Sequence, residues 1–471
     1  MTPYGLLILT RSPFPSKVHQ QSETRLFLLD QGLTVHRSRV LNTLIAALFW
    51  IMVPTVGPRA EPLEALLIQL LATHPQIQFQ RAQVESARKP TERTRASYLP
   101  VVEASGSVGP AHIETDVRNQ SGQPPFDATQ QVARLSITQN IFDGFASSSQ
   151  VKIARLNTDV TRLTLDGTQQ NILFDGISAY LEVLRQAELI ELARISEDSI
   201  MRQAELEDER VERGAGITVD VLQAKSRLQI ARERRVTFEG ELQNAISGFL
   251  EVFNVLPQLE AMSIPTPPFD ALPETLDAAV DKASDNNPAV GSSLAAVEVA
   301  SERRRLARSD YFPRMDIIGS ANHERNFDLL PGVRNDVSLV LMATWQLFNG
   351  FKTSANVAQT AYDYQASRDN HHSSVRTVVE STRLAWQQLL TARQRTDLLE
   401  NAVGIAEEVF QARANLREAG NETVINVLIA EDEVNNARIN LTIARYDAIL
   451  AVYQLLLATG QLDLETLGIR G

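Results

Sequence analysis

The chain has 471 residues, of which 44% are hydrophobic and 22% charged, and its net charge is −12. This composition is typical of a folded protein, and a mean hydropathy of −0.14 excludes a polytopic helical membrane protein. The acidic balance, without a basic block, argues against a nucleic-acid partner. The absence of cysteine excludes disulfides, thiolate metal sites, thiol catalysis and an acylated lipoprotein anchor.

Residues 1–60 are expected to be an N-terminal extension and a signal peptide. A basic stretch at 36–39 precedes an apolar run of about 14 residues at 40–53, and small residues then lead to Ala60. The run is shorter than the ~20 residues that a membrane-spanning helix needs. Residues 1–34 fit either a start codon assigned too early or a long n-region. A buried core helix is the alternative for the apolar run.

The rest of the chain contains an internal repeat. The hexapeptide NIFDGF at 140–145 returns as QLFNGF at 346–351, which is 206 residues later. The stretch 214–224 matches 420–430 at the same spacing, whereas matches upstream of the hexapeptide have a spacing of 213 residues. The first copy therefore carries seven extra residues before its hexapeptide. A repeat of this length constrains the fold more than any local propensity does.

The repeat divides the chain into two units. We predict a first unit at 61–255, a Pro-rich linker at 256–273, a second unit at 274–459 and a C-terminal tail at 460–471. The linker cannot be one continuous helix, because proline removes a backbone donor and clashes with the preceding turn. It falls where two shorter helices, the end of the first unit and a helix predicted at 274–309, would meet end to end.

Each unit is expected to contain a long helix and a return helix. No proline interrupts 146–213 or 352–419, and return helices are predicted at 222–255 and 424–459. Between 375 and 410, apolar or small residues recur at alternating spacings of three and four. This pattern is typical of a coiled-coil seam.

The periodicity changes to two between the helical stretches. Apolar and polar residues alternate there, which predicts strands. The four predicted strands are 98–109, 132–142, 311–324 and 336–348. Strands of about 10–12 residues with one apolar and one polar face suit a transmembrane β-barrel, although a half-buried soluble sheet shows the same alternation. Four strands cannot close a barrel, and an open edge in lipid leaves backbone groups unpaired, so such a chain must oligomerise. Two chains would give eight strands and three would give twelve.

The junctions between strands and helices use the same residues in both copies. A Tyr-x-Pro ends a helix before a strand, since the residue before proline avoids the helical region. The Phe-x-Gly-Phe marks the passage from a strand into a long helix, with aromatic residues at interfacial depth and a glycine that permits the change of backbone direction. The predicted junction residues are Tyr98, Pro100, Phe142, Gly144, Phe145, Tyr311, Pro313, Phe348, Gly350 and Phe351.

Together these features resemble the TolC-like outer-membrane factors, and most closely the branch that serves type I secretion. The resemblance covers 61–470 and rests on the duplicated plan, on two Gly-x₅-(Asp/Asn)-Val-Leu turns and on the closing YQLLLATGQLDLETLG at 453–468. It implies an α+β membrane protein of the Gram-negative outer membrane. In this architecture a homotrimer forms a twelve-stranded barrel that contacts outer-membrane lipid, and an α-helical barrel continues it through the periplasm. The implied partners are a periplasmic adaptor and an inner-membrane transporter, either an ABC transporter or a proton-driven pump.

One loop favours the secretion branch. The segment 324–351 resembles the Asn-x-Asp-x-x-Pro-Gly-x-x-Asn-Asp pattern of that branch, and the matching residues are Asn326, Asp328, Pro331, Gly332, Asn335 and Asp336. An ordinary turn between two strands is the other interpretation. Drug-efflux members of the family are the alternative for function, and many of them carry a lipid-anchored cysteine that this chain lacks.

The turns between the long and return helices are the candidate sites. Glycine accepts the left-handed geometry that ends a helix. The resemblance implies that these turns form the periplasmic mouth and contact the adaptor, whereas ordinary helical hairpins are the alternative. The candidate residues are Gly214, Thr218, Asp220, Leu222, Gly420, Val424, Asn426, Leu428 and Ile429.

The second turn departs from the family pattern. In well-known members, aspartates ring the pore at the positions of Asn426 and Ile429, which are uncharged here, whereas Asp220 in the first turn keeps a carboxylate. Either the closed mouth is held by different contacts or it is less selective for cations. An Asn426→Asp change is expected to increase block by cations.

No catalytic residue, cofactor or metal site is expected, so the protein is not predicted to be an enzyme. The adjacent His371 and His372 would point about 100° apart on a helix and make a poor metal pair. The carboxylate pairs Glu407-Glu408 and Glu431-Asp432 are expected on solvated helix faces. The alternative from another class is a soluble periplasmic coiled-coil scaffold with β-hairpins packed on its helices.

Overall fold

A computed structural model describes residues 63–214, 216–327, 329 and 331–469. The expected N-terminal extension and signal peptide lie outside the described residues. The first repeat contains α1 (Leu63–Thr73), α2 (Pro75–Arg95), η1 (Ala96–Tyr98), β1 (Val101–Ile113), α3 (Asp116–Gln120), β2 (Phe126–Phe142), α4 (Ala146–Glu212) and α5 (Thr218–Phe253). The linker holds two short 3₁₀ helices, η2 (Leu259–Ala261) and η3 (Phe269–Ala271). The second repeat contains α6 (Leu276–Asn286), α7 (Pro288–Ser309), β3 (Arg314–Arg325), β4 (Val333–Thr344), α8 (Lys352–Glu418) and α9 (Val424–Ala458).

The helix predicted at 274–309 is two helices in the structure. It breaks at Asn287, whose backbone is extended because Pro288 follows it. The Asn287 side chain then caps α7 by accepting a hydrogen bond from the amide of Ala289 over 2.9 Å. The first repeat has the same break between α1 and α2, at His74 before Pro75.

The four predicted strands are present, with shifted ends. β2 begins at Phe126 rather than at 132, and β4 spans Val333–Thr344 rather than 336–348. Trp345 leaves the strand, and its indole Nε1 donates to the backbone oxygen of Tyr311 over 3.1 Å. The short helix α3 lies in the longer β1–β2 connection of the first repeat, and the sequence patterns did not predict it.

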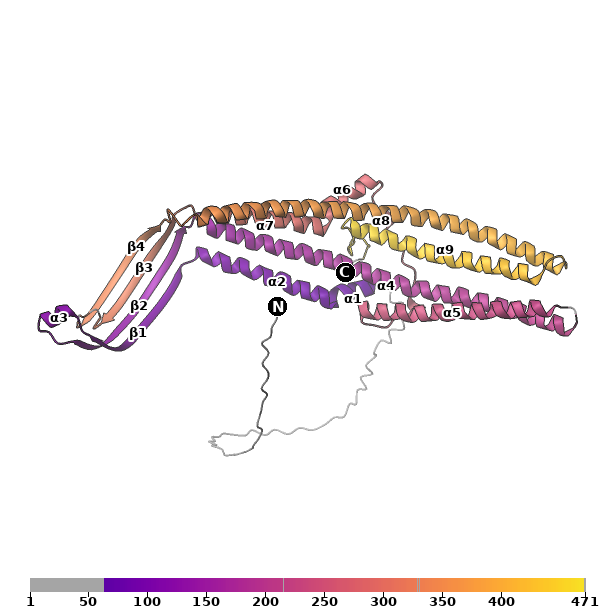
Figure 1. The fold of residues 1–471 in the computed structure, drawn as a ribbon, viewed down its shortest axis with the longest axis horizontal. Coiled ribbons are helices and arrows are strands. Elements are labelled where there is room, and N and C mark those ends of the chain that lie inside the picture. The colour runs from indigo at the N-terminus through magenta and orange to yellow at the C-terminus, as the bar shows by residue number, and fades with distance from the viewer. Residues whose placement is uncertain (1–62, 215, 328, 330, 470–471) are drawn as a thin grey trace, which may run out of the picture. The chain divides into compact units, whose positions relative to one another are not determined.

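The strands form one antiparallel sheet in the order β1-β2-β3-β4. In Figure 1 the sheet lies at one end of the helices, and α3 lies at the end of the sheet farthest from them. One face of the sheet is apolar and exposed within a single chain: Val337 is 84% exposed and Leu339 is 78% exposed. This is the face that a membrane-spanning barrel turns toward lipid.

The long helices fold into two antiparallel hairpins, α4 with α5 and α8 with α9 (Figure 1). The shorter helix α7 packs between α4 and α8, and α2 packs on α4. The predicted seam of α8 is present, because Val378, Ala385 and Leu389 are buried. The residue directly before each of them is exposed. The helix α9 is long and apolar enough to cross a bilayer by composition, but half of its most apolar part is buried, so it serves as a core helix.

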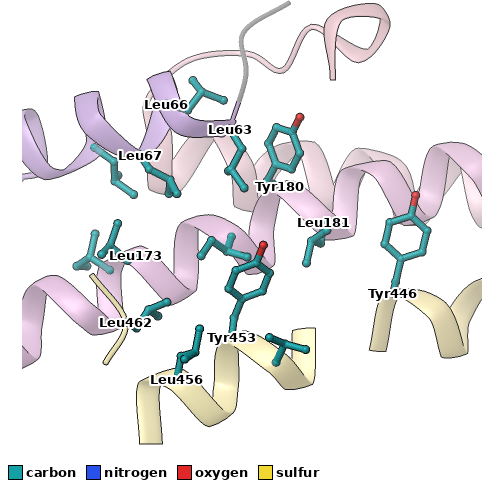
Figure 2. Close-up of a cluster of buried hydrophobic side chains, with 14 of the residues drawn as sticks. Leu63, Leu66, Leu67, Leu173, Tyr180, Leu181, Tyr446, Tyr453, Leu456 and Leu462 are labelled. Carbon is teal, nitrogen blue, oxygen red and sulfur yellow. The ribbon is translucent and has the colours of Figure 1, made fainter. Parts of the chain in front are cut away.

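The main core lies where α1, α4 and α9 meet the C-terminal tail, and Figure 2 shows side chains from these elements converging. Tyr180 of α4 is fully buried there. Its hydroxyl donates to the backbone oxygen of Ser263 over 3.0 Å and accepts from the Ser263 amide over 2.9 Å. This pair of hydrogen bonds attaches the Pro-rich linker to the middle of the long helix.

Candidate functional site

Each long helix ends at a glycine in the left-handed conformation. The φ angle is 74° at Gly214 and 77° at Gly420. The Gly214 amide donates to the oxygen of Val211, and the Gly420 amide donates to the oxygen of Arg417, each over 3.0 Å. The glycines thus satisfy carbonyl groups that a helix end leaves unpaired, and they let the chain reverse.

The other candidate residues of the tips fall into two groups. Thr218 and Leu222 of α5 and Ile429 of α9 are exposed, with Leu222 63% and Ile429 43% exposed, whereas Asp220 is half-buried. The apolar side chains of Leu222 and Ile429 are therefore available to a partner at the end of the helical hairpins.

Val424 and Leu428 are buried instead. They pack against residues of α4 and α5 in a small cluster that also contains Ile200, Ala204, Ala224, Leu228 and Ala231. Their position joins the second hairpin to the first and presents no surface within the chain. The sequence predicts them as part of the mouth, and within one chain they are buried between the two hairpins.

Asn426 is engaged with a carboxylate of its own turn. Its side-chain Nδ2 donates to Glu422 Oε1 over 2.6 Å, and the amide of Thr423 donates to the same oxygen over 2.9 Å. These two donors hold the pKa of the Glu422 carboxyl below its usual value, with the Asn426 side chain as the larger cause. The second turn thus holds an amide that stabilises a neighbouring carboxylate.

A buried ion pair ties the two hairpins together near their tips. Arg417 of α8 donates through Nη2 to Glu207 Oε1 of α4 over 2.6 Å, and the Glu207 side chain is only 7% exposed. Arg210 donates to the same oxygen over 3.0 Å from one turn along α4. Glu207 follows Ile200 and Ala204 at helical spacing on a buried face, so a charged residue in an apolar stripe was the signal that could have revealed this contact.

A second set of contacts joins α9 to the first hairpin. Glu431 and Asp432 were expected on a solvated face, and this expectation is wrong for Glu431, which is buried. Gln203 of α4 donates to Glu431 Oε2 over 2.7 Å, and Arg227 of α5 pairs with Asp432. Burial raises the pKa of the Glu431 carboxyl, because a low-dielectric site disfavours the charged form.

The strand–helix junctions repeat in three dimensions as they do in the sequence. Both residues of each Gly-Phe pair have a positive φ: 66° and 72° at Gly144 and Phe145, and 66° and 67° at Gly350 and Phe351. A left-handed phenylalanine is sterically costly, which marks these turns as constrained. At each site the two phenylalanines meet edge to face, with ring centroids 5.6 Å apart in the first copy and 5.5 Å in the second.

The fourth residue of each hexapeptide, Asp143 or Asn349, caps the start of the long helix. Asp143 Oδ2 accepts a hydrogen bond from the Ser147 amide over 2.8 Å, and Asn349 Oδ1 accepts one from the Thr353 amide over 3.4 Å. Both side chains satisfy donors that the first turn of a helix leaves free. This capping role explains why the first copy can carry an aspartate and the second an asparagine at this position. The sequence signal was a Ser or Thr four residues later.

The junctions differ in what surrounds the glycine. A Cβ atom at Gly144 would lie 2.6 Å from the backbone oxygen of Ser309, whereas one at Gly350 would meet no atom of the chain within 4 Å. At the same end of the sheet, Pro100 and Pro313 directly precede β1 and β3, as predicted. Tyr98 and Tyr311 are half exposed beside them. Phe348, after β4, is 72% exposed.

Among the described residues, no cluster of three or more His, Asp or Glu side chains could hold a metal ion. His371 is instead within 2.9 Å of the Ser293 hydroxyl through Nδ1. The residues that the structure brings together are those of packing, capping and ion pairing. The arrangement thus consists of an apolar-faced sheet joined to long helical hairpins whose tips are tied together.

Comparison with known proteins decides the family. A family model described as outer membrane efflux protein matches residues 66–248 and 279–461, which are the two repeats. The chain belongs to this family. TolC of Vibrio cholerae is 24% identical over 413 residues, which is 86% of this chain and 92% of that protein. The alkaline protease secretion protein AprF of Pseudomonas aeruginosa is 25% identical over 412 residues, which is 83% of each chain.

A solved structure shows the same fold. The outer membrane protein VceC of Vibrio cholerae superimposes with a TM-score of 0.72 at 15% identity, covering 84% of this chain and 96% of that one. The protein is accordingly an exit channel of the outer membrane, and three chains combine their four strands each into the barrel. The soluble scaffold alternative does not hold, because the exposed apolar face of the sheet is the lipid-facing surface of that barrel.

Proposed function

We propose that this channel is the exit duct of a type I protein secretion system. In this role, a periplasmic adaptor contacts the helical tips and links them to an inner-membrane ABC transporter. The observation that carries the proposal is the similarity to AprF, a protein named for protease secretion, along 83% of both chains.

The loop pattern that favoured secretion has structural roles in the chain. Asn326 has a positive φ of 54°, and its side-chain Oδ1 accepts from the Gly332 amide over 3.1 Å, which closes the β3–β4 turn. Asn335 lies 2.6 Å from His323 through its Oδ1, across the same two strands. Asp328 lies outside the described residues. The pattern therefore supports the secretion assignment through loop architecture and does not itself identify a cargo.

The exposed side chains of the tips are the proposed adaptor contact. Leu222 and Ile429 expose apolar surface at the ends of α5 and α9, and Thr218 lies beside them at the start of α5. Such surface is costly to leave in water and becomes favourable when a partner covers it. We infer that the adaptor contact uses this apolar pair, while the buried Val424 and Leu428 support it from behind.

The closed mouth is proposed to be held by the ties between the hairpins. The Glu207–Arg417 and Asp432–Arg227 pairs and the Glu431–Gln203 hydrogen bond all join the first repeat to the second. Charged pairs with little exposure are strongly destabilised when one partner is removed. Opening would separate these groups, so they supply the contacts that the family's pore aspartates do not supply here.

Gene deletion in the producing cell separates secretion from efflux. Loss of the gene is expected to remove one or a few large proteins from the culture supernatant, with little change in susceptibility to lipophilic toxic compounds. A supernatant that is unchanged, together with several-fold greater susceptibility, would establish efflux instead. A Leu222→Asp, Ile429→Asp double variant is expected to form trimers but not to restore secretion. Leu256→Asp, at an exposed linker site far from the tips, is the matched control and should restore it.

A further inference from the structure

A row of hydrogen-bonded side chains crosses three strands of the sheet. Arg134 of β2, Asn322 of β3 and Asp336 of β4 are direct partners in the strand register. Arg134 Nε donates to Asn322 Oδ1 over 2.8 Å, and Asn322 Nδ2 donates to Asp336 Oδ2 over 2.8 Å. Neighbouring strands lie about 4.8 Å apart. The asparagine therefore bridges a cation and a carboxylate that belong to strands about 10 Å apart.

A second row lies next to the first. Glu324 and Arg334 are register partners on β3 and β4, and Arg334 Nη1 is 3.9 Å from Glu324 Oε2. Arg334 Nε is also 3.6 Å from Asp336 Oδ1, which connects the two rows. We call the five residues the luminal belt: Arg134, Asn322, Glu324, Arg334 and Asp336. The belt holds two positive and two negative side chains, so its charges balance.

The luminal belt lies on the inner wall of the barrel. Side chains alternate between the two faces of a strand, and Asp336 is next to Val337 on the exposed apolar face. Because that apolar face contacts lipid in the assembled barrel, the belt faces the water-filled lumen. Three chains place three copies of the belt at one level. The level is close to the β3–β4 turn, at the end of the sheet away from the helices (Figure 1).

We propose that the luminal belt keeps the outer end of the barrel electrostatically neutral, so that solutes of either charge pass it, with Arg134 and Asp336 as the residues that determine this lack of charge selectivity. Their fixed charges act on solutes that pass close to the lumen wall, since the Debye length is about 10 Å at 0.1 M salt. In the intact belt these charges cancel, and a cargo of either sign meets little net field. Loss of either residue leaves one uncompensated charge in each of the three chains. This inference concerns the barrel and does not depend on which transport system uses the channel.

The absence of cysteine makes the local potential measurable. Ser338 is exposed and lies on the same face of β4 as Asp336, two residues away and hence about 7 Å along the strand. A Ser338→Cys reporter in purified trimers is treated with two methanethiosulfonates of similar size, one bearing a trimethylammonium group and one a sulfonate. The readout is the ratio of the two modification rates.

Opposite shifts are expected for the two substitutions. Arg134→Gln should raise the ratio of cationic to anionic modification about threefold, and Asp336→Asn should lower it about threefold. The double variant should return the ratio to that of the reporter alone. Arg134→Lys keeps the charge and should leave the ratio unchanged, which separates the field from the hydrogen-bonded geometry.

A reporter at the far end of the molecule supplies the control. Asn421→Cys lies in the second tip turn, beyond the 67 residues of α8, or about 100 Å away, so its ratio should not respond. Unchanged ratios at Ser338→Cys in both single variants would overturn the proposal, and so would equal shifts at the two reporters. If Arg134→Gln does not assemble, the sign of the Asp336→Asn shift decides alone.

Discussion

The two strand–helix junctions share a sequence and a backbone, yet only the first has its packing partner within the chain. Gly144 lies so close to Ser309 and Phe312 that a Cβ atom would be 2.6 Å and 2.9 Å from them. Gly350 has the same φ of 66° but open space around it, and Phe351 beside it is 74% exposed. One chain therefore completes the environment of its first junction and leaves the second to a neighbour.

The repeat identifies what that neighbour supplies. A shift of 213 residues relates Ser309 to Ala96 and Phe312 to Leu99. Within one chain, α2 packs on α4, and α7 packs on both α4 and α8, which leaves one side of α8 without its counterpart of α2. We infer that α2 of the next chain takes this place in the trimer. The duplication thus leads to assembly, because the second repeat packs on the first within one chain and on the first repeat of the next chain in the trimer.

Substitution of the two glycines is expected to have the largest effect on stability. Gly144→Ala combines a positive φ with a clash against backbone and should destabilise the protein by about 3 kcal/mol. If the neighbouring chain fills the space at Gly350, then Gly350→Ala should lower the dissociation temperature of the trimer as strongly. The measurement is the temperature at which trimers dissociate on a gel. If the space at Gly350 stays open in the trimer, Gly350→Ala should cost only about 1 kcal/mol, from its left-handed backbone.

The tie between the repeats within one chain gives the next largest effect. Arg417→Ala leaves the buried Glu207 with Arg210 alone, which should weaken closure by about 2 kcal/mol. Single-channel conductance in planar bilayers should rise, because the two hairpins separate more readily. Arg213→Ala removes an exposed ion pair with Glu209 at the end of α4 and is the matched control. A conductance equal to that of the unmodified channel in both variants would count against this tie.

A smaller effect is expected from pH. The raised pKa of the buried Glu431 means that its carboxyl holds a proton more tightly in the closed contact than in water. Closure is therefore favoured at low pH and weakens as pH rises through the range above the ordinary carboxyl pKa. Ser199, Gln203 and Arg202 favour the charged form and Asp432 opposes it, but burial outweighs them.

The channel should thus open more often as the pH is raised from about 4 to about 7. Glu431→Gln is uncharged at every pH and should abolish this part of the dependence. Glu433→Gln, on the same helix, is a control that should retain it. A pH profile that Glu431→Gln leaves intact would exclude Glu431 as the responsible group.

The comparison of the two tip turns gives the smallest change, because it affects block rather than closure. The first turn keeps a carboxylate at Asp220, whereas the second has Asn426 bonded to Glu422. Asn426→Asp would place two carboxylates side by side in each chain and should increase block of the single-channel current by divalent cations. Asn421→Asp, five residues earlier at the same tip, is the control. Unchanged block would indicate that Asn426 does not face the pore.

Much of this fold follows from patterns in the sequence. The proline-free stretches predicted α4 and α8 to within a residue at either end, because a long helix depends on local properties of the chain. The four strands were also predicted, since alternation with period two is a local signal. Their ends were less predictable: β2 extends back to Phe126, and β4 ends at Thr344, where Trp345 turns to bond the backbone of Tyr311.

The candidate site was only partly predictable, because its key contacts join residues about 200 positions apart. The turns were located by their glycines, but nothing local indicates that Arg417 reaches Glu207 or that Arg227 reaches Asp432. Glu431 was placed on a solvated face because it lies in a charged pair, whereas tertiary packing buries it. The breaks at His74 and Asn287, by contrast, are local, because each residue precedes a proline and therefore avoids the helical region. The continuous helix predicted at 274–309 overlooked this signal.

The most direct test of the account cross-links the two repeats across chains. The chain is free of cysteine, so Lys89→Cys with Ala358→Cys introduces one pair, at the positions that the repeat relates to Glu302 and Lys152. Glu302→Cys with Lys152→Cys is the matched pair within a chain, because the native side chains are 2.8 Å apart there. The account predicts that a short bismaleimide links the chains of the first variant into covalent trimers on a denaturing gel, while the second variant is linked within separate chains. Failure of the first pair to link chains, with the second pair still cross-linked, would contradict the account.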